Sequence, residues 1–193
     1  MHHVIAPLDT DHARVVTQLS GDLAAALSID PDDAARRPPH LTLASYTGLE
    51  PLSATATLAP VLATVPPVTV RAHGYGLFVG DADTDLSLHV MVVRTRALDD
   101  LHRQVHAALR EAGASRERGI TDPSVWTPHI TLLDRGLSPR LLGDAVEILA
   151  RRPHRTWTIT LESLTVTRRH GGVDTEPTAM ALGIATRGHG RRS

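Results

Sequence analysis

Two short stretches of the chain carry nearly the same residues in the same order. The first is PHLTL at 39–43 and the second is PHITL at 128–132, so in each a histidine precedes a threonine by two residues. Imidazole exchanges protons near neutral pH, and a hydroxyl donates hydrogen bonds to phosphate oxygens. Two such pairs would supply the base, the acid and the phosphate contacts needed to cleave a phosphodiester.

A β-strand would bring each histidine and threonine together, because side chains alternate between its two faces. His40 and Thr42 would point one way and Leu41 and Leu43 the other, and the second copy at 129–132 repeats this pattern. In-line attack on phosphorus needs the base and the acid on opposite sides. A single unit would more often be structural, but two units at equivalent positions favour catalysis on the two walls of one cleft.

The repetition extends beyond these motifs. The segment LDTDHARVVTQL at 8–19 matches LDDLHRQVHAAL at 98–109, and a Gly-Leu-X-Pro unit follows each motif at 48–51 and 136–139. The two copies keep an almost constant offset over most of each half. This pattern indicates that the chain is an internal duplication.

Hydrophobic periodicity and turn residues predict the same element order in both halves. Helices are expected at 9–27, 51–63, 97–113 and 138–150, the first capped by Asp9 or Thr10. Strands are expected at 3–8, 40–46, 65–79, 86–95, 129–133, 155–168 and 176–186. The strand at 65–79 is expected to break or bulge near its glycines, Gly74 and Gly76.

This order predicts an α+β fold of bilobal, duplicated form, with two antiparallel-rich sheets and flanking helices around a central cleft. We expect residues 1–193 to form a single domain. It would consist of two pseudo-repeat lobes, at approximately 8–80 and 98–170, with their terminal strands exchanged or shared.

Composition narrows the possible partners. The chain has 193 residues and a net charge of −1, which disfavours a protein that coats long nucleic acid through a broad basic face. It has no cysteine, which excludes disulfides and thiolate metal sites. No apolar run approaches the roughly 18 residues that span a bilayer. We expect a cytoplasmic monomer without a membrane partner.

The paired His-x-Thr motifs resemble the signatures of the 2H phosphoesterase superfamily. HITLLDR at 129–135 looks most like the RNA 2′,3′-cyclic phosphodiesterases, also called 2′-5′ RNA ligase-like proteins. The resemblance covers nearly the whole chain. It implies a bilobal fold with a central cleft, metal-independent catalysis without a cofactor, and hydrolysis of a ribose 2′,3′-cyclic phosphate to a 2′-phosphomonoester. The partner would be a small nucleotide or an RNA end carrying a cyclic phosphate.

By the same resemblance, His40 and His129 are the acid–base pair, and Thr42 and Thr131 hold the phosphate. Which histidine is the base stays open. Tyr46 is a candidate for stacking on a base and Arg135 for meeting a phosphate, although both residue types are equally typical of a surface.

Other functions stay open on the same site. One is a non-catalytic module that binds a nucleotide or an RNA end. Another is cleavage or ligation of 2′-5′ linkages, because the same acid and base serve both directions of a reversible transfer. A different cyclic phosphate, such as cyclic ADP-ribose phosphate, is a third.

Four other histidines are candidates of lesser weight. His102 and His106 stand four apart on a predicted helix, as in a zinc-binding helix, but the glutamate that such a motif requires is absent, so a solvated helix face is expected. His73 and His89 lie on predicted strands, and the sequence does not determine which way they face.

Overall fold

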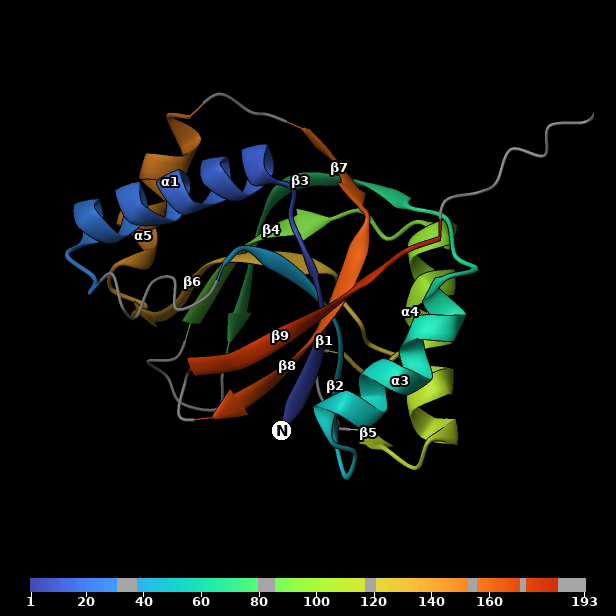
Figure 1. Ribbon diagram of the computed structural model, residues 1–193. Helices are drawn as coiled ribbons and strands as arrows, with labels where there is room; N and C mark the ends of the chain where they lie inside the picture. The colour runs from blue at the N-terminus through green and yellow to red at the C-terminus, as the bar shows by residue number, and fades with distance from the viewer. Residues whose placement is uncertain (31–37, 80–85, 117–120, 153–155, 171–172, 184–193) are drawn as a thin grey trace, which may run out of the picture.

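The computed structural model describes residues 1–30, 38–79, 86–116, 121–152, 156–170 and 173–183. In these ranges helices and strands mix in an α+β fold, drawn in Figure 1. The helices are α1 (Thr10–Leu27), α3 (Pro51–Leu62), α4 (Arg96–Glu111) and α5 (Leu142–Ala150). The strands are β1 (His2–Pro7), β2 (His40–Thr47), β3 (Val68–Val79), β4 (Leu86–Val92), β5 (Ser115–Arg116), β6 (His129–Leu137), β7 (Trp157–Leu161), β8 (Ser163–His170) and β9 (Val173–Ala181).

The predicted α+β class and its antiparallel strands are confirmed. The main sheet runs β7-β3-β4-β6-β2-β1-β8-β9, and β5 pairs with β2 outside this path. The predicted cap of the first helix is also confirmed: the Asp9 side chain accepts a hydrogen bond from the His12 amide at 3.0 Å. A carboxylate there satisfies an amide that has no partner within the helix.

Each half of the sheet contains strands from both sequence repeats. The motif strands β2 and β6 lie at the centre, flanked by the first strands of the repeats, β1 and β4. Beyond them, β3 of the first repeat pairs with β4, and β8 of the second repeat pairs with β1. Neither repeat can therefore complete its half of the sheet without the other.

One predicted strand is wrong. The segment 155–168 was expected to be continuous, but Glu162 separates β7 from β8, and the two strands pair with different partners. β7 pairs with β3, at one end of the sheet, and β8 pairs with β1, near the other end. Because one residue joins them, the sheet must curl until its ends approach, as Figure 1 shows where β7 runs into β8.

The two expected sheets are joined into one by a single pairing, Leu41 with Ile130. Beyond this pair β2 and β6 diverge, and side chains satisfy carbonyls that a regular ladder would have paired. Trp126 Nε1 donates to the Thr42 carbonyl at 3.2 Å, and His106 Nε2 donates to the Leu43 carbonyl at 3.2 Å. The Ser20 hydroxyl donates to the Leu132 carbonyl. The first of these bonds links the segment before β6 to β2, and the other two attach α4 to β2 and α1 to β6.

The helices cover the apolar face of each half. α1 packs against α5 and β6, whereas α3 and α4 pack against each other and against β8, β9 and β2. Figure 1 shows these two helix pairs on opposite sides of the molecule. The motif leucines, Leu41, Leu43 and Leu132, are 1% exposed or less and belong to one connected core. Along the described chain, no helix is long and apolar enough to cross a membrane.

The repeated glycine after each motif has a conformational reason. Gly48 has φ +78° and Gly136 has φ +80°, in the left-handed region that other residues enter at a cost. Gly48 follows β2, whereas Gly136 is the last residue but one of β6. In the first repeat the chain then enters α3 with Pro51 at the start of the helix. The glycine of each Gly-Leu-X-Pro unit thus marks a left-handed backbone position at the end of a motif strand.

Candidate active site

The four motif side chains come from the starts of the two central strands. Leu41 and Ile130 are direct partners, so extending the antiparallel register by one residue sets His40 opposite Thr131 and sets Thr42 opposite His129. The two aliphatic partners are buried at 1% exposure and face the core. By alternation the two histidines and two threonines share the other face, and all four are partly exposed.

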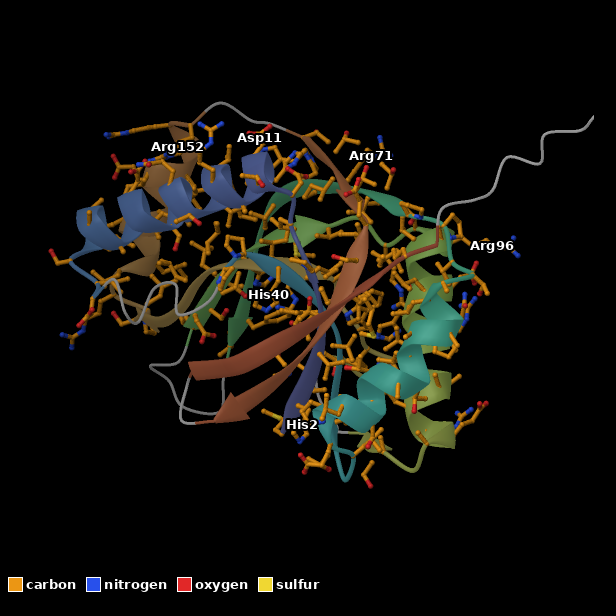
Figure 2. All side chains as sticks on the ribbon, viewed as in Figure 1. His2, Asp11, His40, Arg71, Arg96 and Arg152 are labelled. Carbon is orange, nitrogen blue, oxygen red and sulfur yellow. The ribbon has the colours of Figure 1, made fainter. Side chains whose placement is uncertain are left out.

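Both catalytic candidates are held by the same local bond. His40 Nδ1 lies 2.8 Å from the Pro38 carbonyl oxygen, and His129 Nδ1 lies 2.8 Å from the Thr127 carbonyl oxygen. A carbonyl can only accept, so Nδ1 carries the proton in each ring. In the neutral ring Nε2 is then the proton acceptor. Figure 2 shows His40 near the middle of the molecule, between the two helix pairs.

The charges of the two histidines influence one another. Burial lowers the pKa of His129, and positive charge on His40 lowers it further. The Thr127 carbonyl and the Asp134 carboxylate act in the opposite direction, because each favours the charged imidazolium. Coulombic interaction weakens with distance and with solvent screening. The effect of the His40 charge on the pKa of His129 is therefore expected if the two rings face the same space.

His129 also lies in an aromatic cluster with Phe78 and His89. Its ring centroid is 4.7 Å from that of Phe78, edge to face, and 5.0 Å from that of His89. Phe78 stacks on His89 at 4.2 Å. Sequence reasoning left the direction of His89 open and overlooked Phe78. Phe78 could have been singled out because it is the one phenylalanine of the chain and stands at the end of a predicted strand.

His73, the other histidine whose direction the sequence left open, lies away from the motif residues. His73 is exposed, and its Nδ1 is 3.4 Å from the Thr156 hydroxyl. Of His73 and His89, only His89 thus lies beside a motif residue.

Tyr46 lies away from the four motif side chains, although strict alternation would put it on their face. Val4 pairs with Ala44 and Ile5 pairs with Thr42, so Leu43 is an extra residue on β2. This bulge turns Tyr46 to the apolar side, where it is 1% exposed and stacks on His2 at 5.4 Å. Burial, with the Glu50 carboxylate nearby, raises the pKa of its phenol.

Arg135 belongs to β6, but its side chain lies outside the described residues. The structure therefore sets four of the six predicted site residues on one face and places Tyr46 in the core, and the phosphate contact of Arg135 stays a prediction.

The predicted solvated face for His102 and His106 is wrong. His102 is 1% exposed, stacks on Trp126 at 3.8 Å and donates from Nε2 to the Thr121 carbonyl at 3.2 Å. Burial and the neighbouring charge of His106 lower the pKa of His102 to about 4. Among the described residues no group of histidines and carboxylates could hold a metal ion. His106 instead joins α4 to β2 through the Leu43 carbonyl, and His102 joins α4 to the segment before β6 through Thr121 and Trp126.

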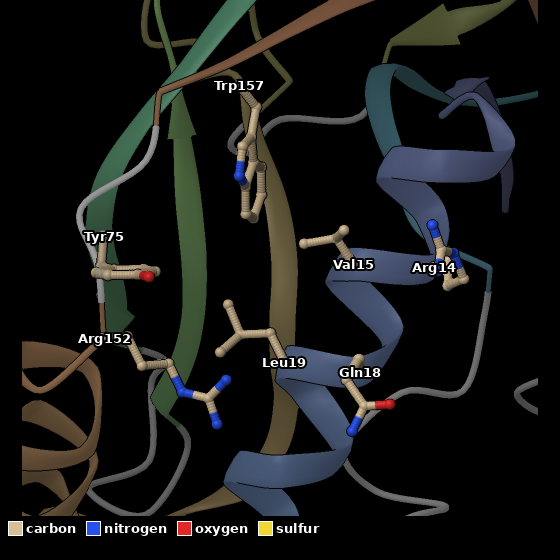
Figure 3. Close-up of a pocket in the computed structure, with 7 residues that line it drawn as sticks. All are labelled: Arg14, Val15, Gln18, Leu19, Tyr75, Arg152 and Trp157. Carbon is tan, nitrogen blue, oxygen red and sulfur yellow. The ribbon is translucent and has the colours of Figure 1, made fainter.

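A separate hollow of about 400 Å³ lies between α1, β3 and β7 (Figure 3). Tyr75 and Trp157, two of its walls, pair across the sheet with Val90 and Ala72, which are buried. The hollow therefore lies on the side of the sheet that faces the helices. The residues that line it are Arg14, Val15, Gln18, Leu19, Tyr75, Arg152 and Trp157, and none belongs to the two motifs.

Comparison with known proteins gives one family. A model of the 2′-5′ RNA ligase superfamily matches residues 8–173, whereas no curated protein matches the chain. Escherichia coli LigT complexed with 3′-AMP has a TM-score of 0.58 at 17% identity, over 94% of this chain and 97% of LigT. TT0787 of Thermus thermophilus has a TM-score of 0.61 at 16% identity, over 95% of this chain and 98% of TT0787. Kluyveromyces marxianus Usb1 has a TM-score of 0.51 at 12% identity, over 94% of this chain and 97% of Usb1.

The similar structures share the fold over nearly their whole lengths, and the family model spans most of the chain. This confirms the resemblance drawn from the paired motifs. The chain belongs to the 2′-5′ RNA ligase superfamily, within the 2H phosphoesterases.

Proposed function

We propose that the protein is a metal-independent phosphodiesterase that hydrolyses a ribose 2′,3′-cyclic phosphate to a 2′-phosphomonoester. The observation that carries this proposal is the register of β2 and β6, which puts both imidazoles and both threonine hydroxyls on one face. The matched Nδ1 bonds of His40 and His129 support it, because both rings then present Nε2 to the same space.

In the proposed reaction, one histidine accepts a proton from water while the water oxygen attacks phosphorus. The bond from phosphorus to O3′ breaks, and the other histidine donates its proton to that oxygen. The product has a 3′-hydroxyl and a 2′-phosphate. The Thr42 and Thr131 hydroxyls donate to the two non-bridging oxygens, where the negative charge of the transition state resides.

The substrate class follows from charge and from the relatives. A net charge of −1 suits a small nucleotide or an RNA end better than a long polyanion. Structures of E. coli LigT are complexed with 3′-AMP, ATP and NADP+. We therefore propose a nucleotide-sized group carrying the cyclic phosphate.

The first prediction concerns the two histidines. His40→Ala and His129→Ala should each lower turnover of a nucleoside 2′,3′-cyclic phosphate by roughly 10²–10⁴-fold, because each removes one proton transfer. Product formation is followed by mass spectrometry, which also identifies the 2′-phosphate. His73→Ala, at an exposed histidine away from the motifs, is the matched control and should keep full activity.

Circular dichroism would verify that all three variants are folded. The proposal also requires that turnover be unchanged in EDTA. Wild-type activity in both histidine variants would refute the catalytic assignment. Binding of the cyclic nucleotide by calorimetry with no product from the wild type would favour a non-catalytic module.

A second candidate function is cleavage or ligation of 2′-5′ linkages, and the description of the matching family favours it. A 5′-hydroxyl would replace water as the attacking group, with the same base, acid and leaving O3′. Incubation of a 2′,3′-cyclic phosphate end with a 5′-hydroxyl oligonucleotide should then give a joined product. Mass spectrometry of 2′-5′ dinucleotides tests the reverse direction.

A further inference from the structure

The hollow between α1, β3 and β7 lies on the opposite side of the sheet from the paired motifs. Across the strands, Tyr75 pairs with Val90 and Val90 pairs with Ile130, and the two aliphatic partners are buried in the core. Thr131 and its partner His89 occupy the next row, whose side chains face the other way by alternation. A molecule in the hollow would therefore have the sheet between itself and the motif side chains.

The sequence repeat shows that this hollow is particular to one half of the molecule. In the match between the two repeats, Val15 and Leu19 of α1 correspond to Val105 and Leu109 of α4. Val105 is 0% exposed on a helix that packs against α3. Val15 is 40% exposed and lines the hollow together with Leu19. Of two equivalent helix positions, one is thus covered and the other is open to the hollow.

The body of the hollow suits a small flat apolar group. Figure 3 shows Val15 and Leu19 reaching from α1 toward the space that Trp157 and Tyr75 border from the strands. Both rings are only partly buried, and aromatic rings favour stacked or edge-to-face contact with another ring. The volume of about 400 Å³ lies within the range of small-molecule sites, roughly 300–1,000 Å³.

One end of the hollow suits a negative charge. Figure 3 shows the Arg152 guanidinium directed into it from the side of Tyr75. Burial raises the pKa of the Tyr75 phenol, and the positive charge of Arg152 opposes this shift, which accords with a guanidinium close to the hydroxyl. Arg14 is the other charged residue of the lining, and none of the described lining residues is acidic.

Asp22, which is not part of the lining, orients the polar side chains at this end. Arg152 Nη2 donates to Asp22 at 2.7 Å, and Gln18 Nε2 donates to it at 2.6 Å. A guanidinium has five N–H donors, so this bond leaves others for a ligand. The charge of Asp22 offsets part of that of Arg152, which favours a singly charged anion over a doubly charged one. The planar guanidinium matches the geometry of a carboxylate.

We propose that the hollow between α1, β3 and β7 is a binding site for a small planar aromatic molecule that carries one carboxylate. The aromatic ring lies against Trp157, Val15 and Leu19. The carboxylate accepts hydrogen bonds from the Arg152 guanidinium and the Tyr75 hydroxyl. The site shares no residue with the two motifs, so it does not depend on the proposed function.

The test is a titration of the full chain with 2-naphthoate, followed by ¹H–¹⁵N NMR of the tryptophan indole groups. The chain has two tryptophans, and Trp126→Phe assigns their two signals. The Trp157 signal should shift to saturation, whereas the Trp126 signal should not move. The uncharged 2-naphthamide should bind at least about tenfold more weakly, because it lacks the charge-assisted hydrogen bonds of the carboxylate.

Three variants locate the probe. Arg152→Gln should weaken binding of 2-naphthoate by roughly 10–100-fold. Arg151→Gln removes the same charge from the next residue, whose side chain is 76% exposed and pairs with Glu147, so this matched control should keep wild-type affinity. Val15→Trp fills the hollow from α1 and should abolish binding. Circular dichroism would verify that each variant is folded.

A Trp157 signal that does not saturate, equal binding of 2-naphthoate and 2-naphthamide, or wild-type affinity in Arg152→Gln would overturn the proposal. The comparison of the two ligands needs no variant, so it decides the matter even if Arg152→Gln does not fold. Displacement of the probe by inorganic phosphate would show a phosphate site instead of a carboxylate site. The double variant His40→Gln/His129→Gln should bind the probe normally, and weaker binding there would place the probe in the motif site.

Discussion

Each motif histidine depends on its immediate neighbours for its chemistry. Pro38 and Thr127, two residues before the histidines, supply carbonyls that fix the proton on Nδ1. Such a bond selects the tautomer and orients the ring, as partners of functional histidines commonly do. The repeated His-x-Thr unit therefore includes the residues that precede it.

Buried histidines outside the motifs give the protein a pH-dependent stability. His102 has its pKa lowered from 6.5 to about 4 in the folded state. Between these values the unfolded chain binds a proton at this site that the folded chain does not. The free energy of unfolding should therefore fall as pH drops from about 6.5 to about 4, by about 3 kcal/mol from this residue.

Urea unfolding at several pH values checks this prediction. His102→Phe keeps a flat ring against Trp126 but cannot titrate, so its stability should depend less steeply on pH in that range. Val79→Ala, at an exposed residue without an ionisable group, should keep the wild-type slope. An unchanged slope in His102→Phe would show that His102 binds its proton equally well in both states.

Among the secondary-structure elements, each motif strand has a glycine in the left-handed conformation at its end, Gly48 just after β2 and Gly136 as the last residue but one of β6. Gly48 and Gly136 have almost equal positive φ values, so both would strain an alanine. Their surroundings differ. A Cβ at Gly136 would lie 2.7 Å from Ile29 Cγ2, whereas the nearest atom to one at Gly48 is 3.8 Å away.

The two alanine variants should therefore differ in stability. Gly48→Ala should lower the free energy of unfolding by about 1 kcal/mol, through backbone strain alone. Gly136→Ala should lower it by about 2–4 kcal/mol, because crowding against Ile29 adds to the strain. Denaturant unfolding measures both.

A double variant tests whether crowding against Ile29 is the cause of the larger loss in Gly136→Ala. In an Ile29→Ala background, the cost of Gly136→Ala should approach that of Gly48→Ala, since the crowded atom is gone. Equal costs for the two glycines in the wild-type background would contradict this account.

At the scale of the whole molecule, the strand order links the two repeats. β3 of the first repeat pairs with β4, the first strand of the second repeat, and β8 of the second repeat pairs with β1, the first strand of the first repeat. One connected core runs beneath both halves. We propose that residues 1–193 form one domain of two interlocked repeats.

Such a domain should unfold in one cooperative transition. The two tryptophans lie in different halves: Trp126 bonds to β2, and Trp157 begins β7. In Trp126→Phe and in Trp157→Phe, the remaining tryptophan should report the same midpoint as far-UV circular dichroism of that variant. A fluorescence midpoint that separates from the dichroism midpoint would indicate lobes that unfold independently.

Much of the fold could be predicted because the sequence patterns that indicate its helices and strands are local or periodic. Alternation along PHLTL and PHITL placed the histidines with the threonines, and the repeat offset indicated two equivalent strands. Family membership followed from the same residues. The division of 155–168 at Glu162 could not be predicted, because both pieces have strand composition and differ only in their distant partners.

Residue patterns along the chain were enough to predict the duplicated α+β class, the paired motif and the family. The side chains that surround the motif depend on how distant strands pair. A bulge at Leu43 turned Tyr46 into the core, and the pairing of β3, β4 and β6 brought Phe78 and His89 to His129. The physical reason is that alternation is a property of one strand, whereas register and bulges are set between strands that are far apart in the chain.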